Sequence, residues 1–339
     1  MTETNTDINT NITDDQILYI HTRKIPAIKS LIEALKEIFR DVNIKFTPKI
    51  EKSVDGDPTK TKITGGMYIT ALNSNSNILV RLHLEADKFC YYHCKPENDK
   101  QYIMLGINMS NLFKLIKFLN NDDELFMVYD RRSLNQLNLQ YVNKQKKFTS
   151  NYYLNLLDLK EDIFNIGKQQ FDFVITMPSS DFHSLIKNMG VIAEQVDIKF
   201  ITTKNNYSLS FSCRGEFASQ ESVFNGIANS QNENNMINVL KNNMNNENNE
   251  NENENKNEGE HKSKEDEHTI IQGIYELKAL SLFSRCSSLC STIELYIKND
   301  SPLVIKYRIA DMGSVHLILS PINNNDGIEN DSDNESEQE

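Results

Sequence analysis

Cysteine and histidine are the residue types in this chain whose spacing first suggests chemistry. Cys90 and Cys94 flank His93, and thiolate and imidazole groups at such spacing can hold zinc. A closed zinc site needs a second pair of ligands at a suitable spacing. The remaining close pair, Cys286 and Cys290, falls in a stretch with helical periodicity. The sequence therefore predicts no metal site and no cofactor.

Catalytic residue types also occur close together, but not in a catalytic arrangement. Asp181, His183 and Ser184 adjoin on one predicted helix, and adjacency along a helix cannot form a nucleophilic triad. The chain has no glycine-rich phosphate loop with its lysine. Pairs of acids are abundant only in polar runs that hold no fixed geometry. We therefore predict that the protein is not an enzyme, and an unrecognised hydrolase is the alternative from a different class.

The charge of the chain is unevenly distributed. The 339 residues carry a net charge of −12, which by itself disfavours nucleic acid as a partner. Residues 229–268 hold ten acids and four lysines, 322–339 hold seven acids and no base, and 1–15 hold four acids. Without these stretches the remainder carries about +5. The part that can fold can therefore still present a basic surface.

Low-complexity composition predicts disorder in the same acidic stretches. The Asn- and Glu-rich run cannot bury enough apolar area to offset its ordering entropy, so residues from about 229 to 268 are predicted to form a disordered insertion in a loop. Residues 1–15 and 322–339 are predicted to be disordered ends. Five cysteines, no apolar run of membrane length and a polar start indicate a reduced, soluble, intracellular protein with no membrane partner.

Periodic patterns predict an α+β protein with two similar halves. Apolar residues at helical spacing predict helices over 24–42, 110–119, 177–189 and 276–289. Short alternating runs predict strands over 67–72, 78–85, 152–159, 171–177, 291–297 and 303–310. The order of helix, strands and helix occurs twice, over 24–119 and 178–289, which suggests an internal duplication and a two-domain protomer.

Every predicted helix carries basic residues away from its apolar stripe. These residues are Lys29, Lys36, Lys114, Lys117, Lys187, Lys278 and Arg285. For any single helix a solvated face is the simpler interpretation. Four helices of four, in a net-acidic chain, favour a surface that contacts phosphates without reading bases.

The stretch SPLVIKYRIADMGSVHLILSPI, residues 301–322, resembles the last domain of the proliferating cell nuclear antigen (PCNA) family of eukaryotic DNA sliding clamps. Similar stretches occur in the same order at 32–39, 105–118, 151–159, 174–182 and 210–217. The resemblance covers about 16–228 and 269–322. Departures from the family are a longer hairpin at 47–64, an extension at 95–104 and the Asn/Glu-rich insertion.

The resemblance implies a closed homotrimeric ring, with helices lining a hole for double-stranded DNA and sheets outside. It divides the chain into clamp domain 1 (16–155), an interdomain connector loop (156–172) and clamp domain 2 (173–321). The seven basic residues above match the family's inner face, although Ser30 and Ser184 stand where a base is usual. Edge strands near 147–155 and 219–227 would pair between subunits, and the interface residues would be Phe148, Tyr152 and Val223.

The resemblance also implies docking of partners that carry the family's PIP-box motif, including DNA polymerase, nucleases and ligases, besides a clamp loader. By position, the pocket comprises Leu72, Leu79, Phe164, Ile166, Pro302, Ile318, Ser320 and Pro321. The expected function is a nuclear processivity factor for replication and repair. A specialised paralogue, or one subunit of a heterotrimeric clamp of the checkpoint type, is the alternative that the sequence leaves open.

Overall fold

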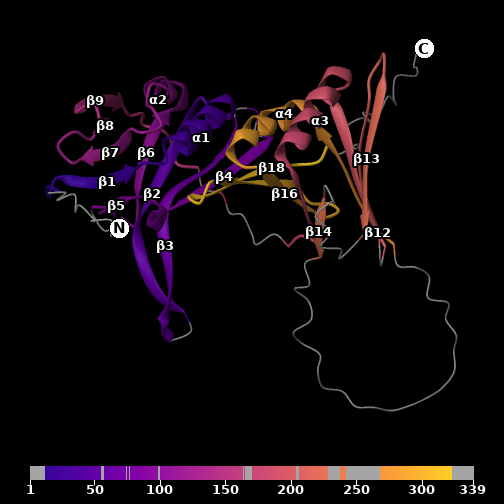
Figure 1. Cartoon of the computed structure of the whole chain (residues 1–339), viewed down its shortest axis with the longest axis horizontal. Helices are drawn as coiled ribbons and strands as arrows, with labels where there is room; N and C mark the ends of the chain where they lie inside the picture. The colour runs from indigo at the N-terminus through magenta and orange to yellow at the C-terminus, as the bar shows by residue number, and fades with distance from the viewer. Residues whose placement is uncertain are drawn as a thin grey trace, which may run out of the picture.

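The computed structural model of the chain describes residues 12–54, 57–73, 75, 77–97, 100–162, 164, 170–203, 206–227, 237–241 and 268–322. Residues 1–11, most of the predicted disordered insertion and 323–339 lie outside these ranges. Within the described ranges, three β-sheets carry helices along one side (Figure 1).

The two halves of the chain contain the same strands and α-helices in the same order, and only the 3-10 turns differ in place. The first half has β1 (Gln16–Thr22), α1 (Ile25–Ile38), β2 (Asp41–Val54), β3 (Asp57–Leu72), β4 (Ile78–Glu85), the 3-10 turn η1 (Ala86–Lys88), β5 (Tyr91–Cys94), β6 (Ile103–Asn108), α2 (Met109–Ile116), β7 (Glu124–Asp130), β8 (Gln136–Asn143) and β9 (Phe148–Asn155). The second half has β10 (Phe173–Pro178), α3 (Ser179–Ile192), β11 (Gln195–Thr202), β12 (Asn206–Arg214), β13 (Ser219–Ile227), β14 (Asn238–Lys241), β15 (Thr269–Glu276), α4 (Leu277–Ser284), the 3-10 turn η2 (Arg285–Leu289), β16 (Thr292–Ile297), β17 (Leu303–Ile309) and β18 (Gly313–Leu319). This order confirms the α+β class and the internal duplication.

One sheet joins the two halves. Its nine strands run in the order β14-β10-β16-β17-β18-β4-β3-β2-β6, and the antiparallel pair of β18 with β4 is the junction between the halves. A five-stranded sheet, β5-β1-β7-β8-β9, belongs to the first half, and a four-stranded sheet, β13-β12-β11-β15, to the second. Strand β9 ends one of these sheets and β13 ends the other.

Each helix buries the apolar stripe that predicted it. Helix α1 starts with Pro26 in its first turn, where a missing N–H costs no hydrogen bond, and it buries Leu31 and Leu35 completely or nearly so. Helix α2 is capped by Asn108, whose side-chain oxygen accepts a hydrogen bond from the backbone N–H of Asn111 at 2.9 Å. The polar residues between the buried positions are thereby turned away from the sheets.

Several predicted boundaries are corrected by the structure. Helix α1 ends at Ile38 rather than 42, because the chain becomes extended at Phe39 and enters β2. The predicted helix 276–289 is an α-helix only to Ser284 and continues as the 3-10 turn η2. The predicted strand 152–159 lies too far along the chain: β9 ends at Asn155, and Leu157 instead bridges Gly106.

The predicted disordered insertion contains a strand. Within 229–268, β14 (Asn238–Lys241) pairs with β10 and extends the central sheet, and Ile237 beside it is buried. Ile237 and Val239 pack on the core while Leu240 is 66% exposed, and a polar, low-complexity context surrounds this segment in the sequence. The average composition of these forty residues therefore does not indicate the strand, which forms because β10 offers it an unpaired edge.

Strands β2 and β3 extend beyond the sheet as a two-stranded arm, at the hairpin that the sequence predicted to be long. Strand β6 pairs with β2 only as far as Phe46, and β4 pairs with β3 only from Gly66 onward. Figure 1 shows this arm reaching away from the helices. The Tyr92 hydroxyl lies 2.9 Å from the carbonyl oxygens of both Thr47 and Gly66, which fixes the base of the arm.

Candidate DNA-facing surface and partner pocket

The four helices form one layer across both halves. Helix α1 packs against α2 on one side and against α4 and η2 on the other, and α4 packs against α3. Figure 1 shows the resulting order α2, α1, α4, α3 along one side of the sheets. The basic residues of four separate sequence segments therefore share one side of the molecule.

The predicted basic residues on this helix layer differ in their exposure to solvent and in their partners within the chain. The side chains of Lys114, Lys117, Lys187, Lys278 and Arg285 are exposed. Lys29 and Lys36 are only half exposed. The Lys29 ammonium donates to the carbonyl of Leu119 at 2.9 Å, and the Lys36 ammonium lies 3.0 Å from Glu37 and 4.4 Å from the centre of the Phe113 ring.

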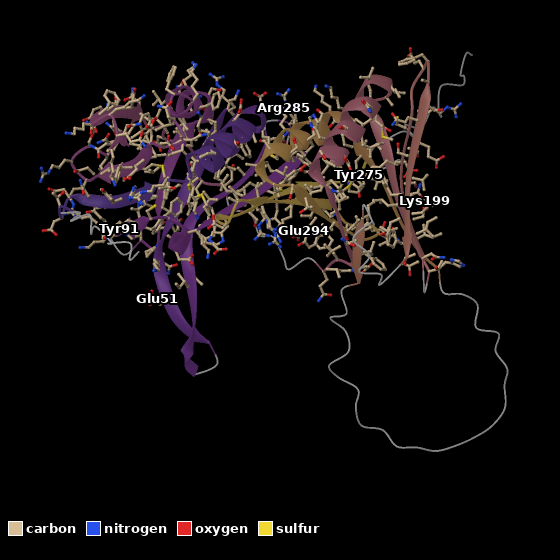
Figure 2. The ribbon with its side chains drawn as sticks, viewed as in Figure 1. Glu51, Tyr91, Lys199, Tyr275, Arg285 and Glu294 are labelled. Carbon is tan, nitrogen blue, oxygen red and sulfur yellow. The ribbon has the colours of Figure 1, made fainter. Side chains whose placement is uncertain are left out.

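Helix α1 also carries acids that the sequence-based assignment left out. Glu33 and Glu37 are exposed on it, so the two lysines of α1 are matched by two glutamates. Glu37 also lies 3.6 Å from Arg285, which Figure 2 shows on the helical side of the molecule. The exposed positive charge that has no ion pair with a described residue is therefore concentrated at Lys114, Lys117, Lys187 and Lys278. A charge count per helix, rather than a search for bases, would have found this.

Three predicted pocket residues line up on the outer face of the central sheet, away from the helices. Leu72, Leu79 and Ile318 are direct cross-strand partners on β3, β4 and β18. Ile318 is buried, Leu79 is half-buried and Leu72 is exposed. Pro302, Ser320 and Pro321 lie just beyond the strand ends next to this row, because Leu303 and Leu319 form the last pair in the ladder of β17 with β18. Ile166 lies outside the described residues.

The connector loop is held against the same face. The Leu157 N–H donates to the carbonyl of Gly106 at 2.8 Å, and the Asn43 side chain donates to the carbonyl of Lys160 at 2.8 Å. Beneath this loop is a hollow of about 490 Å³ lined by fourteen residues, which include Leu72 and Phe164. The structure thus brings together predicted pocket residues that lie some ninety positions apart in the sequence.

The polar tip that departs from the family pattern has a structural role. The side-chain oxygen of Asn73 accepts hydrogen bonds from the N–H groups of Asn77 and Ile78. The Asn77 side chain in turn donates to Glu276 of the second half at 2.7 Å. Asparagine closes the turn between β3 and β4 here and ties it to the other half of the chain.

The predicted interface strands are β9 and β13, and each exposes apolar side chains at the end of its sheet. Phe148 is 56% exposed and Val223 is 49% exposed. Tyr152 is instead half-buried and packs on Tyr141 with ring centres 4.8 Å apart, whereas its neighbour Tyr153 is 62% exposed. Phe118, Val191 and Phe217, which were not singled out from the sequence, are the most exposed large apolar side chains among the described residues.

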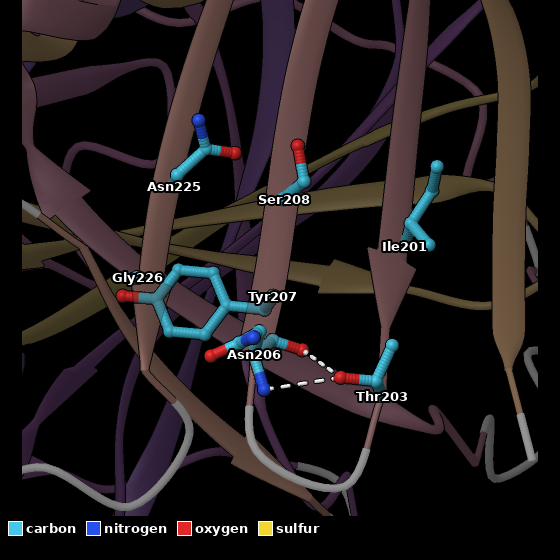
Figure 3. Close-up of a pocket in the computed structure, with 7 residues that line it drawn as sticks. All are labelled: Ile201, Thr203, Asn206, Tyr207, Ser208, Asn225 and Gly226. Atoms are coloured by element: carbon cyan, nitrogen blue, oxygen red, sulfur yellow. Dashed lines mark hydrogen bonds between the residues drawn. The ribbon is translucent and has the colours of Figure 1, made fainter. Parts of the chain in front are cut away.

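A second hollow, of about 520 Å³, opens on the four-stranded sheet of the second half (Figure 3). Thr203 and Asn206 line it and bond to each other, and the Tyr207 ring lies directly beside Gly226. None of the predicted site residues lies there, so this hollow plays no part in the site.

Among the described residues, no group of three or more His, Cys, Asp and Glu side chains is placed to hold a metal ion. No helix in that part of the chain is long and apolar enough to span a membrane. Burial raises the pKa of the Cys94 thiol to about 12, so the candidate ligand identified from the sequence is a protonated, partly buried thiol.

A two-domain subunit with helices on one side, a central sheet shared by both halves, and β9 and β13 as end strands of the two outer sheets has the DNA-clamp class of fold. The chain belongs to the proliferating cell nuclear antigen family: residues 20–164 match the model of its N-terminal domain, and 165–248 and 242–322 match that of its C-terminal domain. A crystal structure of proliferating cellular nuclear antigen from Entamoeba histolytica superposes with a TM-score of 0.67 at 18% identity, covering 91% of this chain and all of that one. This likeness concerns the fold.

Two curated viral relatives are also similar. The probable DNA polymerase sliding clamp of Acanthamoeba polyphaga mimivirus is 28% identical over 334 residues, which is 92% of this chain but 63% of that protein. Probable DNA polymerase sliding clamp 1 of Paramecium bursaria Chlorella virus 1 is 26% identical over 310 residues, covering 91% of this chain and 98% of its own length.

Proposed function

We propose that three copies of this chain close into a ring around duplex DNA and act as a sliding clamp, a processivity factor for DNA polymerase. The observation that carries the proposal is the identity of the open edges. Among the described strands, β5 of the first half and its counterpart β14 of the second half both end a sheet. The same holds for β6 and its counterpart β15. Only β9 and β13 are open while their counterparts, β18 and β4, are paired.

The antiparallel pair of β18 with β4 within the chain is therefore our template for the pairing of β9 with β13 between subunits. Met127, Leu139 and Tyr152 are successive cross-strand partners in the first half. Leu295, Ile305 and Leu317 repeat that ladder in the second half. Tyr152 is thus the counterpart of Leu317, which pairs with Val80 of β4.

The other side of the junction is matched in the same way. Phe46, Met67 and Leu84 are successive partners in the first half. Phe200, Leu209 and Phe224 are the corresponding partners in the second half. Phe224 is thus the counterpart of Leu84, and Val80 corresponds to Gln220. We expect β9 to pair antiparallel with β13 of the next subunit, with Tyr152 opposite Gln220 and Asn151 opposite Glu221.

Such a contact joins unlike edges head to tail, so it closes a ring when the rotation per subunit permits. It also covers strand edges that would otherwise invite aggregation. The work of the ring is topological and requires no catalytic site. The proposal includes binding of a clamp loader and of PIP-box nucleases and ligases, and action in the nucleus. The two curated relatives named above are viral proteins.

Cysteine cross-linking tests the ring and its register. Directly opposite residues of antiparallel strands have Cβ atoms about 5 Å apart, within reach of a disulfide, whereas diagonal neighbours are about 7–8 Å apart. Oxidising the Asn151→Cys/Glu221→Cys variant should therefore give covalent trimers on a denaturing gel. The diagonal Asn151→Cys/Ser219→Cys variant and the unmodified chain should give few.

Light scattering of the purified chain separates the two clamp hypotheses. A homotrimer should have three times the subunit mass of 39.1 kDa. A chain that stays monomeric at all concentrations, with no cross-linked trimer, would favour the heterotrimeric alternative and overturn the homotrimer.

We predict that PIP-box peptides bind at the outer hollow. Phe164→Ala and Leu72→Ala should each weaken such a peptide by about 1–3 kcal/mol, the range for losing a buried apolar anchor. Leu134→Ala, which removes an exposed leucine in the turn between β7 and β8, is the matched control. Calorimetry that finds equal affinity for all three variants would place the pocket elsewhere.

A further inference from the structure

The apolar pocket row continues into charged residues on the same outer face. Side chains two positions apart on a strand lie on one face, about 7 Å apart. Arg81 follows Leu79 at this spacing on β4, and His316 precedes Ile318 on β18. Arg81 and His316 are direct cross-strand partners.

Strand β17 adds two more cations to this face. Lys306 pairs with His316 in the ladder, and Arg308 follows two positions further along. The patch formed by Arg81, Lys306 and Arg308 is called the outer cationic patch. Burial, and then the charges of Lys306 and Arg81, lower the pKa of His316, so its imidazole is held neutral beside the patch.

One acid lies within the patch and does not cancel its charge. Glu294 lies 2.9 Å from the Lys306 ammonium and 3.1 Å from the Arg308 guanidinium, and it also accepts from the Tyr296 hydroxyl. Figure 2 shows Glu294 on the side of the molecule opposite the helices. The Arg308 side chain is 68% exposed despite this contact, and Arg81 is exposed with no ion pair to a described acid. Three cations against one carboxylate leave a net positive surface.

We propose that the outer cationic patch recognises acidic residues in the partner peptides whose apolar anchor occupies the pocket row. This inference rests on the proposed function and specifies the chemistry of its partners. An extended peptide advances about 3.3–3.6 Å per residue. A carboxylate two residues from the anchor then reaches Arg81, and one four residues away reaches the level of Arg308. The apolar row and the cations form one continuous face, which favours a peptide that carries both features over a nucleic acid.

Three labelled peptides test the inference against the full-length chain. They share one apolar anchor motif and carry Glu, Gln or Lys at the positions two and four residues from it. Exposed ion pairs are individually weak, so at low salt the Glu peptide should bind roughly three- to tenfold more tightly than the Gln peptide. The Lys peptide should bind least well, and the preference should diminish with added salt.

The preference should be lost in the Arg81→Gln/Arg308→Gln variant. It should persist in Lys95→Gln/Lys100→Gln, which removes the same charge from exposed positions in the loop between β5 and β6. Equal binding of the Glu and Gln peptides to the unmodified chain would overturn the inference while leaving the pocket intact. So would a preference that persists in the arginine variant.

A chain shortened by residues 323–339, together with the arginine variant, distinguishes two other occupants of the patch. If the Glu preference appears only after removal of residues 323–339, the acidic end of this chain occupies the patch and the partner assignment is wrong. If the arginine variant loses affinity for a short oligonucleotide and peptide charge has no effect, the patch is a nucleic-acid contact and the inference is wrong. Failure of all three peptides to bind would overturn the proposed pocket and this inference together.

Discussion

Placing a negative charge on both β9 and β13, the edge strands proposed to pair between subunits, should convert the proposed ring into monomers. In the Tyr153→Asp/Val223→Asp variant, each new carboxylate would have to be desolvated within a strand pair, and the one at position 223 lies two residues from Glu221. Both original side chains are about half exposed or more, so the fold of the subunit should be little affected. Light scattering should give the subunit mass, and circular dichroism should be unchanged.

Tyr153 is the better position than Tyr152, which the family resemblance suggested. Tyr152 packs on Tyr141 inside its own subunit, so a charge there would destabilise the monomer as well as the ring. Leu134→Asp is a matched control, because it charges an exposed leucine away from both edges. A trimer that persists in the double variant, or one that Leu134→Asp also abolishes, would contradict the interface.

Removing the freely exposed lysines of the helix layer should strongly reduce retention on DNA. In the Lys114→Ala/Lys117→Ala/Lys187→Ala/Lys278→Ala variant, the ring should stay intact while retention on circular DNA of any sequence decreases. The expected contacts are with phosphates, so each one lost should lower the salt slope by about 0.9. Stimulation of a polymerase should decrease in parallel.

The half-buried lysines should matter less. Lys29→Ala/Lys36→Ala should have a smaller effect, because Lys29 bonds to Leu119 and Lys36 to Glu37. Glu37→Gln should instead increase retention, since it releases Lys36 and Arg285. The control for lost charge replaces lysines away from the helices: Lys49, Lys95, Lys100 and Lys199. Equal loss of retention in the control would show that net charge, rather than the helix layer, holds the DNA.

Local patterns in the sequence were sufficient to predict the helices and most strands, and the residue types of the candidate DNA-facing surface. Helices α1 to α4 were predictable because a period of 3.6 residues places Leu31 and Leu35, or Phe182 and Ile186, on one buried stripe. The same period places bases such as Lys114 and Lys278 away from that stripe. The stretch 301–322 was enough to indicate the family, and the repeated order of elements indicated two halves.

Which of these residues lie close to one another depends on the tertiary structure. Glu37 lies 3.6 Å from Arg285 across the boundary between the halves, and Leu72 and Ile318 flank Leu79 in the ladder of β3, β4 and β18. The short strand β14 exists because β10 offers it an edge. Strand pairing joins residues far apart in sequence, so no local pattern reports it. The open edges β9 and β13 were identified for the same reason: their counterparts β18 and β4 are already paired with each other.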